Sequence, residues 1–162
     1  MDYLWSPWRY RYLTAPKTSE GCVFCRIAAG NSDEENLIVH RGRDNLIVLN
    51  RYPYTSGHLM VVPYAHASEL SAIDEAAASE MMALMRLSER HLQAIYRPGG
   101  LNLGMNIGES AGAGIAGHIH MHILPRWHGD ANFMTTIGET RILPEDLATT
   151  WDRLRKAFAA PE

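Results

Sequence analysis

Apolar and polar residues alternate most strictly in residues 117–127, which read GHIHMHILPRW. His118, His120 and His122 are separated there by single apolar residues. Successive side chains of a β-strand point to opposite faces, so this spacing places the three imidazoles on one face of a strand. On a helix the same spacing would scatter them around the axis. The segment therefore predicts a strand, which we expect Pro125 to end.

Shorter apolar runs predict the rest of a sheet. Residues 36–50 (NLIVHRGRDNLIVLN) hold two such runs, and the polar residues 41–44 between them are typical of a hairpin turn. Residues 58–63 (HLMVVP) and 101–108 (LNLGMNIG) predict a third and a fourth strand. The histidine-rich segment then becomes the fifth.

Helical spacing occurs in two places. Apolar residues at intervals of three and four predict a long helix over residues 71–97, with Ser71 and Asp74 as a capping pair at its start and the sequence RPGG after its end. A last helix is expected over residues 145–158. Strands gathered around one long helix indicate an α+β fold with a mostly antiparallel sheet.

Length and composition favour one globular domain, 1–162, with 46% hydrophobic and 20% charged residues. Fifteen basic and eighteen acidic residues give a net charge of −3, whereas nucleic-acid-binding proteins more often carry a basic excess. No apolar run approaches the ~20 residues of a membrane helix, and the first residues do not resemble a signal peptide. We therefore expect a cytoplasmic protein without a nucleic-acid or membrane partner.

The two ends of the chain flank this predicted core. Residues 1–20 form an N-terminal arm in which aromatic residues are interleaved with Arg9 and Arg11. Such an arm could stack on bases, but packing against its own domain or a partner subunit is the favoured interpretation. Residues 127–162 form a C-terminal extension beyond the histidine-rich segment.

The two cysteines of the chain, Cys22 and Cys25, form a C-x-x-C pair. A structural disulfide is not expected in a cytoplasmic protein. The pair fits half of a zinc site, a redox motif, or a relic of either. A redox motif would stand at the start of a helix after a strand, and the extended sequence PKTSEG before Cys22 weakens that interpretation. A zinc site would need two further ligands, which histidine could supply.

The three alternating histidines cannot all bind one ion. At roughly 3.3 Å per residue, His118 and His122 lie about 13 Å apart along a strand, whereas two nitrogens on one zinc ion lie no more than about 4 Å apart. The row therefore indicates a catalytic surface. The glycine-rich sequence GESAGAGIAG directly precedes it, and the backbone N–H groups of Gly112 and Gly114 could bind an anion there. Nucleophilic imidazoles beside N–H groups that bind an anion suit phosphoryl or nucleotidyl transfer.

The sequence resembles the histidine triad superfamily of nucleotide hydrolases and transferases. HIHMHIL matches its signature, and the likeness extends to CVFC, LNRYPYTSGHLMVVPYAH and NIGESAGAGIAGHIHMHILPRW. LWSPWRYRYL and RWHGDANFMTTIGETRILPE resemble the bacterial branch that contains diadenosine tetraphosphate phosphorylases, related to the fragile-histidine-triad hydrolases. The resemblance implies a five-stranded antiparallel sheet with one long and one C-terminal helix, paired as a homodimer.

The resemblance also implies roles for individual residues. His120 would be the nucleophile on the α-phosphorus, with His122 and His58 contacting the phosphate and assisting transfer. Asn50 would bind the ribose hydroxyls, and Asn106 would lie near the scissile bridge. The remaining implied residues are the ligands of a structural zinc site: Cys22, Cys25, His66 and His118.

One departure from the family concerns the loop before the triad. Many relatives carry a glutamine, serine or threonine there, and phosphorylase members carry Gly-Ser, whereas this chain has Ala113, Gly114 and Ile115. The hydroxyl that would meet the leaving group or an attacking phosphate is missing, so backbone donors remain. The nucleotidyl-transfer step is therefore expected more firmly than its final acceptor.

Three hypotheses for the function follow. The first is an enzyme that cleaves dinucleoside polyphosphates through a nucleotidyl-histidine intermediate, with water or phosphate as the acceptor. The second is a hydrolase of nucleoside phosphoramidates or adenylylated substrates. The third is a zinc-stabilised nucleotide-binding partner protein, against which the intact histidine row argues because a pure binder has no need of a nucleophile.

Overall fold

A computed structural model describes residues 21–137 and 143–160 of the chain. Its centre is one sheet of five strands: β1 (Ile38–Arg41), β2 (Asn45–Leu49), β3 (Leu59–Pro63), β4 (Gly100–Met105) and β5 (Met121–Arg126). The spatial order is β1-β2-β3-β5-β4, and every neighbouring pair is antiparallel. The expected α+β fold with a five-stranded antiparallel sheet is confirmed.

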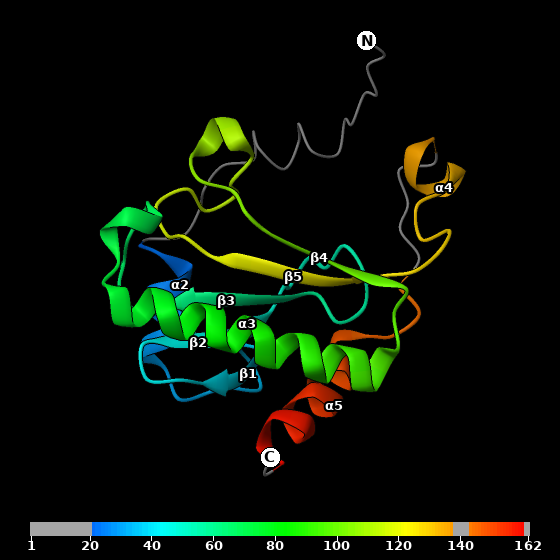
Figure 1. The fold of residues 1–162 in the computed structure, drawn as a ribbon, viewed down its shortest axis with the longest axis horizontal. Coiled ribbons are helices and arrows are strands. Elements are labelled where there is room, and N and C mark those ends of the chain that lie inside the picture. The colour runs from blue at the N-terminus through cyan, green and yellow to red at the C-terminus, as the bar shows by residue number, and fades with distance from the viewer. Residues whose placement is uncertain (1–20, 138–142, 161–162) are drawn as a thin grey trace.

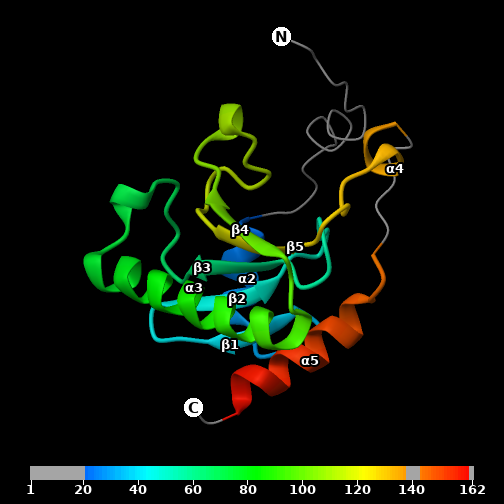
Figure 2. The same cartoon turned by 45° about the vertical axis from the view of Figure 1, so that its right-hand side comes forward.

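Four α-helices accompany the sheet in the described part of the chain: α2 (Val23–Ala29), α3 (Glu75–Tyr96), α4 (Phe133–Thr136) and α5 (Leu147–Ala159). Two short 3₁₀ turns, η1 (Leu70–Ala72) and η2 (Glu109–Ala111), lie in the connections. The long helix α3 crosses one face of the sheet, α2 lies on the other side, and α5 lies beside β1 (Figures 1 and 2). The predicted N-terminal arm lies outside the described residues. No helix in the described part of the chain has the length and hydropathy needed to cross a membrane.

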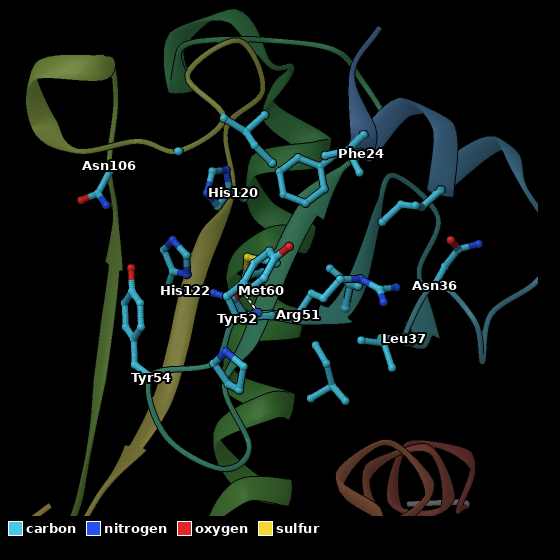
Figure 3. A pocket seen from close by; sticks show the side chains of 18 of the residues that line it. Phe24, Asn36, Leu37, Arg51, Tyr52, Tyr54, Met60, Asn106, His120 and His122 are labelled. Atoms are coloured by element: carbon cyan, nitrogen blue, oxygen red, sulfur yellow. Dashed lines mark hydrogen bonds between the residues drawn. The ribbon is translucent and has the colours of Figure 1, made fainter. Parts of the chain in front are cut away.

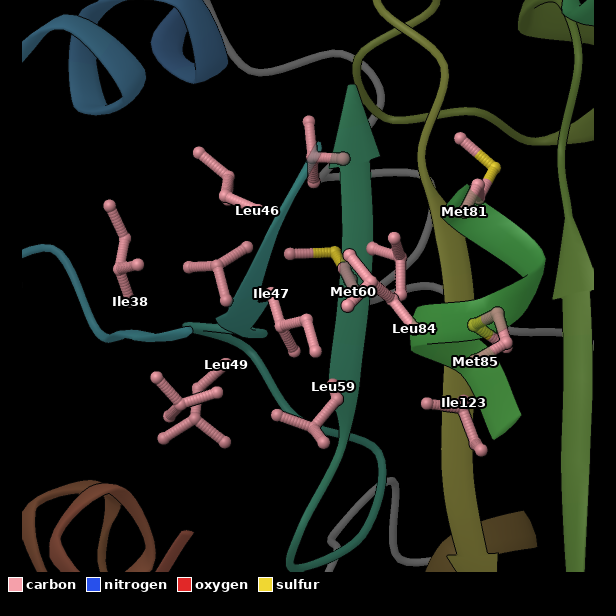
Figure 4. Packing of buried hydrophobic residues seen from close by; sticks show 14 of the residues in the cluster. Ile38, Leu46, Ile47, Leu49, Leu59, Met60, Met81, Leu84, Met85 and Ile123 are labelled. Atoms are coloured by element: carbon pink, nitrogen blue, oxygen red, sulfur yellow. The ribbon is translucent and has the colours of Figure 1, made fainter. Parts of the chain in front are cut away.

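The core lies where the central strands meet α3. All residues of β2 and β3 are buried: α3 covers one face of these strands, and α2 lies on the other side, where its Phe24 and Ile27 belong to the same core (Figure 1). Burial on both faces explains why these strands read as unbroken apolar runs in the sequence. Figure 4 shows Leu84 and Met85 of α3 near Leu59 and Ile123, and Met81 belongs to the same buried cluster.

Two predicted element boundaries are wrong for identifiable reasons. The long helix begins after Asp74, whose carboxylate accepts a hydrogen bond from the Ala77 N–H at 2.7 Å, whereas Ser71 lies in the separate turn η1. Pro125 does not end the last strand but pairs with Leu101 inside it. The Pro125 carbonyl accepts a hydrogen bond from Thr55 Oγ1 at 2.9 Å, so this side of the residue faces a loop. The N–H that proline lacks would point to the same side, where no neighbouring strand requires it.

The histidine-rich segment is only partly a regular strand. β5 begins at Met121, and His118 and His120 lie in the irregular segment just before it. The imidazoles of His120 and His122 nevertheless lie side by side, with ring centroids 4.9 Å apart. The alternation therefore predicted correctly that these two side chains point the same way, although the strand pairing of β5 starts later in the sequence than expected.

Candidate active site

A pocket of about 880 Å³ opens on the face of the sheet opposite α3. His120 and His122 lie in its middle, with Tyr54 and Asn106 to one side and Phe24, Leu37 and Asn36 to the other (Figure 3). The pocket walls come from α2, the ends of β2 and β5, the 50–54 turn and the glycine-rich loop. Chain segments that are far apart in the sequence thus build one cavity around the two histidines.

The ring of His120 is held by its own chain. Its Nδ1 lies 2.9 Å from the carbonyl oxygen of His118, which can only accept a hydrogen bond. Nδ1 therefore carries the proton, and Nε2 of the neutral ring keeps its lone pair. The side chain is buried but lines the pocket, beside the ring of Phe24 at 5.0 Å. A neutral imidazole with a fixed tautomer and an available nitrogen is suited to nucleophilic attack.

His122 and His58 form a second fixed pair. The backbone N–H of Tyr54 donates to Nδ1 of His58 at 3.2 Å, so the proton of a neutral His58 lies on Nε2. That Nε2 is 2.9 Å from Nδ1 of His122 and donates to it. The remaining nitrogen of His122, Nε2, then carries a proton. His58 is fully buried behind His122, whereas His122 lines the pocket.

Burial favours the neutral form of His120 and His122. It lowers the pKa of His122 to about 4, with a further contribution from the charge of His120. Burial also lowers the pKa of His120, although the hydrogen bond to the His118 carbonyl acts in the opposite direction. A buried site disfavours the charged imidazolium because charge is poorly solvated there. The tautomers described above are therefore the relevant ones near neutral pH.

A cluster of metal-ligating side chains lies directly beside the triad. Cys22, Cys25, His66 and His118 bring two sulfurs and two nitrogens within 4.8 Å of one another. Nδ1 of His118 lies 3.3 Å from Sγ of Cys22, 3.6 Å from Sγ of Cys25 and 3.3 Å from Nδ1 of His66. Ligands arranged tetrahedrally around zinc at its usual bond lengths lie about 3.5 Å apart.

The protonation of His118 also fits a metal ligand. Its Nε2 donates to the carbonyl oxygen of Pro63 at 2.9 Å, which leaves the Nδ1 lone pair directed at the cluster. The four predicted zinc ligands therefore form a site that could hold a metal ion. His118 serves this cluster with its ring and orients His120 with its carbonyl group.

The cysteine pair stands at a helix start, contrary to the sequence-based expectation. Cys22 is the residue before α2, and Cys25 lies in its first turn. The redox interpretation still fails on two observations. Two histidines complete the ligand set, and burial together with Cys22 raises the pKa of the Cys25 thiol, whereas redox-active thiols have lowered values.

The structure places the predicted substrate-binding residues on the same pocket. Asn50, Asn106, Gly112 and Gly114 all line it. Asn50 is also part of the turn beside His58, because its Oδ1 accepts from the Tyr52 N–H at 3.0 Å. The N–H of Gly112 donates to the Glu109 carbonyl at 2.8 Å, so this glycine's own N–H is engaged within the loop.

Sequence reasoning missed the wall formed by α2. Phe24 and Ile27 are buried and line the pocket, whereas the cysteines of the same helix face the metal cluster. A helix of seven residues gives too short a pattern to be recognised, and the apolar residues beside the cysteines were the available signal. Arg51 lines the pocket, whereas Arg126 is bound by Asp130 and Asn102 outside it.

Comparison with known proteins identifies the family. Residues 31–129 match the HIT domain model. The chain is 43% identical to AP-4-A phosphorylase of Mycobacterium tuberculosis, over 94% of this chain and 86% of that protein. It is 30% identical to the protein hit of Bacillus subtilis, over 88% of this chain and 97% of that one. The chain belongs to the HIT domain family, and the predicted histidine-triad enzyme is confirmed.

Solved structures agree with this assignment. A Zn-bound histidine triad family protein from Mycobacterium smegmatis superposes with a TM-score of 0.70 at 28% identity, over 86% of this chain and 94% of that one. A hypothetical histidine triad nucleotide-binding protein from Sulfolobus tokodaii gives a TM-score of 0.67 at 28% identity, over 85% and 91%. The first of these contains zinc, which agrees with the four-ligand cluster described above.

Proposed function

We propose that this protein cleaves dinucleoside polyphosphates by transferring a nucleotidyl group to His120. The observation that carries the proposal is the hydrogen bond from Nδ1 of His120 to the His118 carbonyl, which leaves Nε2 as the nucleophilic nitrogen in the pocket. The name of the 43% identical relative, AP-4-A phosphorylase, supports diadenosine tetraphosphate as a substrate.

The reaction has two displacement steps. Nε2 of His120 attacks the α-phosphorus, an N–P bond forms, and the bond to the bridging oxygen breaks with its electron pair leaving on the departing nucleotide. With diadenosine tetraphosphate the departing product is ATP. An acceptor then attacks the same phosphorus, and the N–P electron pair returns to His120. Water as the acceptor gives AMP, and phosphate gives ADP.

His122 and His58 assist by holding a hydrogen-bond donor at the phosphate. His58 donates to Nδ1 of His122, so the Nε2–H of His122 is available to a phosphate oxygen. A donor aligned in advance stabilises the charge that develops in the transition state without reorganising. His58 is buried and would act through His122 rather than on the substrate itself.

The rest of the pocket would bind the nucleotide. Asn50 would bind the ribose, Asn106 would lie near the scissile bridge, and the loop at Gly112 and Gly114 would approach the phosphates, since all four residues line the cavity. The apolar wall of Phe24 and Ile27 suits the base.

Cys22, Cys25, His66 and His118 would hold a zinc ion with a structural role. With these four protein ligands no position would be left for water or substrate, which is typical of structural rather than catalytic zinc. The ion would fix α2 and the His118 segment, so that the nucleophile and one pocket wall share a common support.

We also propose that the protein is a homodimer formed through β4. The other edge of the sheet, β1, is covered by α5, whose Trp151 and Arg155 donate to the Ile38 and Val39 carbonyls at 2.9 Å and 3.1 Å. The residues of β4 are exposed or half-buried, and Leu103 is 47% exposed. An exposed edge strand with an apolar side chain is suited to pairing with a second copy.

Product analysis tests the proposed function. The purified protein is incubated with diadenosine tetraphosphate, with and without phosphate, and His120→Ala serves as the control. ATP with AMP identifies water as the acceptor, and ATP with ADP only when phosphate is present identifies phosphate. Equal turnover by His120→Ala, or cleavage of nucleoside phosphoramidates alone, would overturn the proposal. Nucleotide binding without any turnover would favour a binding protein.

A further inference from the structure

The pocket extends past the catalytic histidines into an apolar arm that ends at a polar side chain. Val23 and Ile27 of α2 line this arm together with Leu37 and Leu49. Asn36 stands at its end, across the pocket from Asn106 and Tyr54 (Figure 3). A few polar groups placed within apolar walls fix the orientation of a ligand.

The backbone that carries Asn36 is held on several sides. The Asn36 N–H donates to the Ser32 carbonyl at 3.0 Å, and the Leu37 N–H donates to the Glu34 carbonyl at 3.0 Å. Nη2 of Arg51 donates to the Glu35 carbonyl at 2.8 Å. These hydrogen bonds fix the direction in which the Asn36 side chain leaves the backbone.

Leu37, the residue after Asn36, has a left-handed backbone with φ of 61°. A non-glycine residue in this region is strained, and such strain persists where the surrounding structure enforces it, often at functional sites. The Leu37 carbonyl accepts from the Leu49 N–H at 2.9 Å, which anchors the strained residue to β2. The strain and the anchoring together preorganise this end of the arm.

The Asn36 side chain is suited to contact a ligand. It is half-buried and lines the pocket, and its carboxamide has no hydrogen-bond partner within the described ranges 21–137 and 143–160. A carboxamide presents one donor and one acceptor side by side. The outer edge of a purine ring presents the complementary pair: N6–H with N1 in adenine, and O6 with N1–H in guanine.

We propose that Asn36 is a specificity-determining residue that reads the far edge of the base and makes the pocket selective for purine nucleotides. The inference rests on the proposed function, which places the α-phosphate at His120 and the ribose near Asn50, so that the base enters the apolar arm. A pyrimidine is shorter by one ring. Its hydrogen-bonding edge stops short of Asn36, and it covers less of the apolar wall.

Equilibrium binding of AMP, GMP and UMP to the full-length protein, measured by calorimetry, tests the inference independently of turnover. We expect tighter binding of both purine nucleotides than of UMP, and we expect Asn36→Ala to reduce this preference by about tenfold because the hydrogen-bonding partner of the base is lost. Asn36→Asp should shift the preference from AMP toward GMP by a similar factor. Its carboxylate only accepts hydrogen bonds, and guanine offers two donors, N1–H and the N2 amine, on this edge.

Asn31→Asp is the matched control, because Asn31 is an exposed residue of the same loop outside the pocket. This variant introduces the same charge and should leave all three affinities in the wild-type ratio. Normal nucleotide binding with unchanged ratios in both Asn36 variants would overturn the inference and leave the proposed function standing. Failure of the wild-type protein to bind any of the three nucleotides would overturn both.

Discussion

The three triad histidines are chemically identical, but they differ in which ring nitrogen carries the proton or in what the other nitrogen faces, because each ring has a different hydrogen-bond partner. The Pro63 carbonyl holds the proton of His118 on Nε2, and the His118 carbonyl holds the proton of His120 on Nδ1. His58 donates to Nδ1 of His122. One ring therefore offers a lone pair to the metal cluster, one offers a lone pair to the pocket, and one offers an N–H to the pocket.

The low pKa of His122 predicts how stability depends on pH. The value is about 4 in the folded protein and 6.5 for an unperturbed histidine, so between these values the unfolded chain binds more protons than the folded one. We therefore expect the free energy of unfolding to be constant above about pH 6.5 and to fall as the pH decreases toward 4. Denaturant unfolding at a series of pH values measures this dependence.

His122→Gln removes the titrating group and serves as the control. The pH dependence should become shallower without disappearing, because burial also lowers the pKa of His40, His118 and His120. A slope that the substitution leaves unchanged would show that His122 is protonated as readily in the folded protein as in the unfolded chain.

Among the helices, α2 connects the metal cluster with the substrate pocket. Its cysteines face the cluster, and Phe24 contacts the rings of His118 at 5.4 Å and His120 at 5.0 Å. Arg41 fixes the other end of the helix, because it donates to the carbonyls of Ala28 and Gly30 at 2.9 Å and 2.7 Å. A seven-residue helix depends on such tertiary contacts, since short helices are marginal alone.

Removal of the metal should therefore affect both stability and nucleotide binding. We expect a chelator to lower the Tm of zinc-loaded protein by ~10 °C or more and to weaken AMP binding by roughly tenfold, because α2 loses its anchor. Thermal denaturation and calorimetry measure the two effects. Cys25→Ser should show the lower Tm without chelator. Zinc-loaded protein whose Tm does not respond to the chelator would refute this role of the cluster.

Helices and strands with long, regular patterns of apolar residues could be predicted from the sequence, and those with short patterns could not. The hairpin and the buried strands β2 and β3 were predicted because their apolar runs are bounded by clear turn residues. The short helix α2 and the true extent of β5 could not be predicted. The first is held by contacts with distant residues such as Arg41, and the second depends on which neighbouring strand faces Pro125.

The site as a whole depends on contacts between residues far apart in the chain. His58 and His122 are 64 positions apart, and Cys22 and His118 are 96 apart. Local patterns indicated residue types suited to catalysis and metal binding, but the resemblance to a known family was needed to group them. Asn36 and the α2 wall line the pocket but were not predicted, because no motif marks them. The predicted single domain over residues 1–162 stays a prediction.

The two edges of the sheet predict the oligomeric state. We expect the protein to sediment as a dimer, at twice the chain mass of 18.2 kDa, because β4 pairs with its copy. Leu103→Lys should shift the protein toward the monomer, since a charged side chain on an edge strand opposes pairing. Leu70→Lys, which changes an exposed leucine in η1, is the control. A wild-type monomer at micromolar concentration would contradict the proposed dimer.

The most direct test of the proposed chemistry is to trap the intermediate. The protein is mixed with diadenosine tetraphosphate, quenched at alkaline pH within the first turnovers, digested and mapped by mass spectrometry. We expect one adenylate group on His120, in the peptide that ends at Arg126, and none in His120→Ala. Adenylate on another residue, or continued turnover by His120→Ala without any adduct, would contradict a nucleotidyl-His120 intermediate.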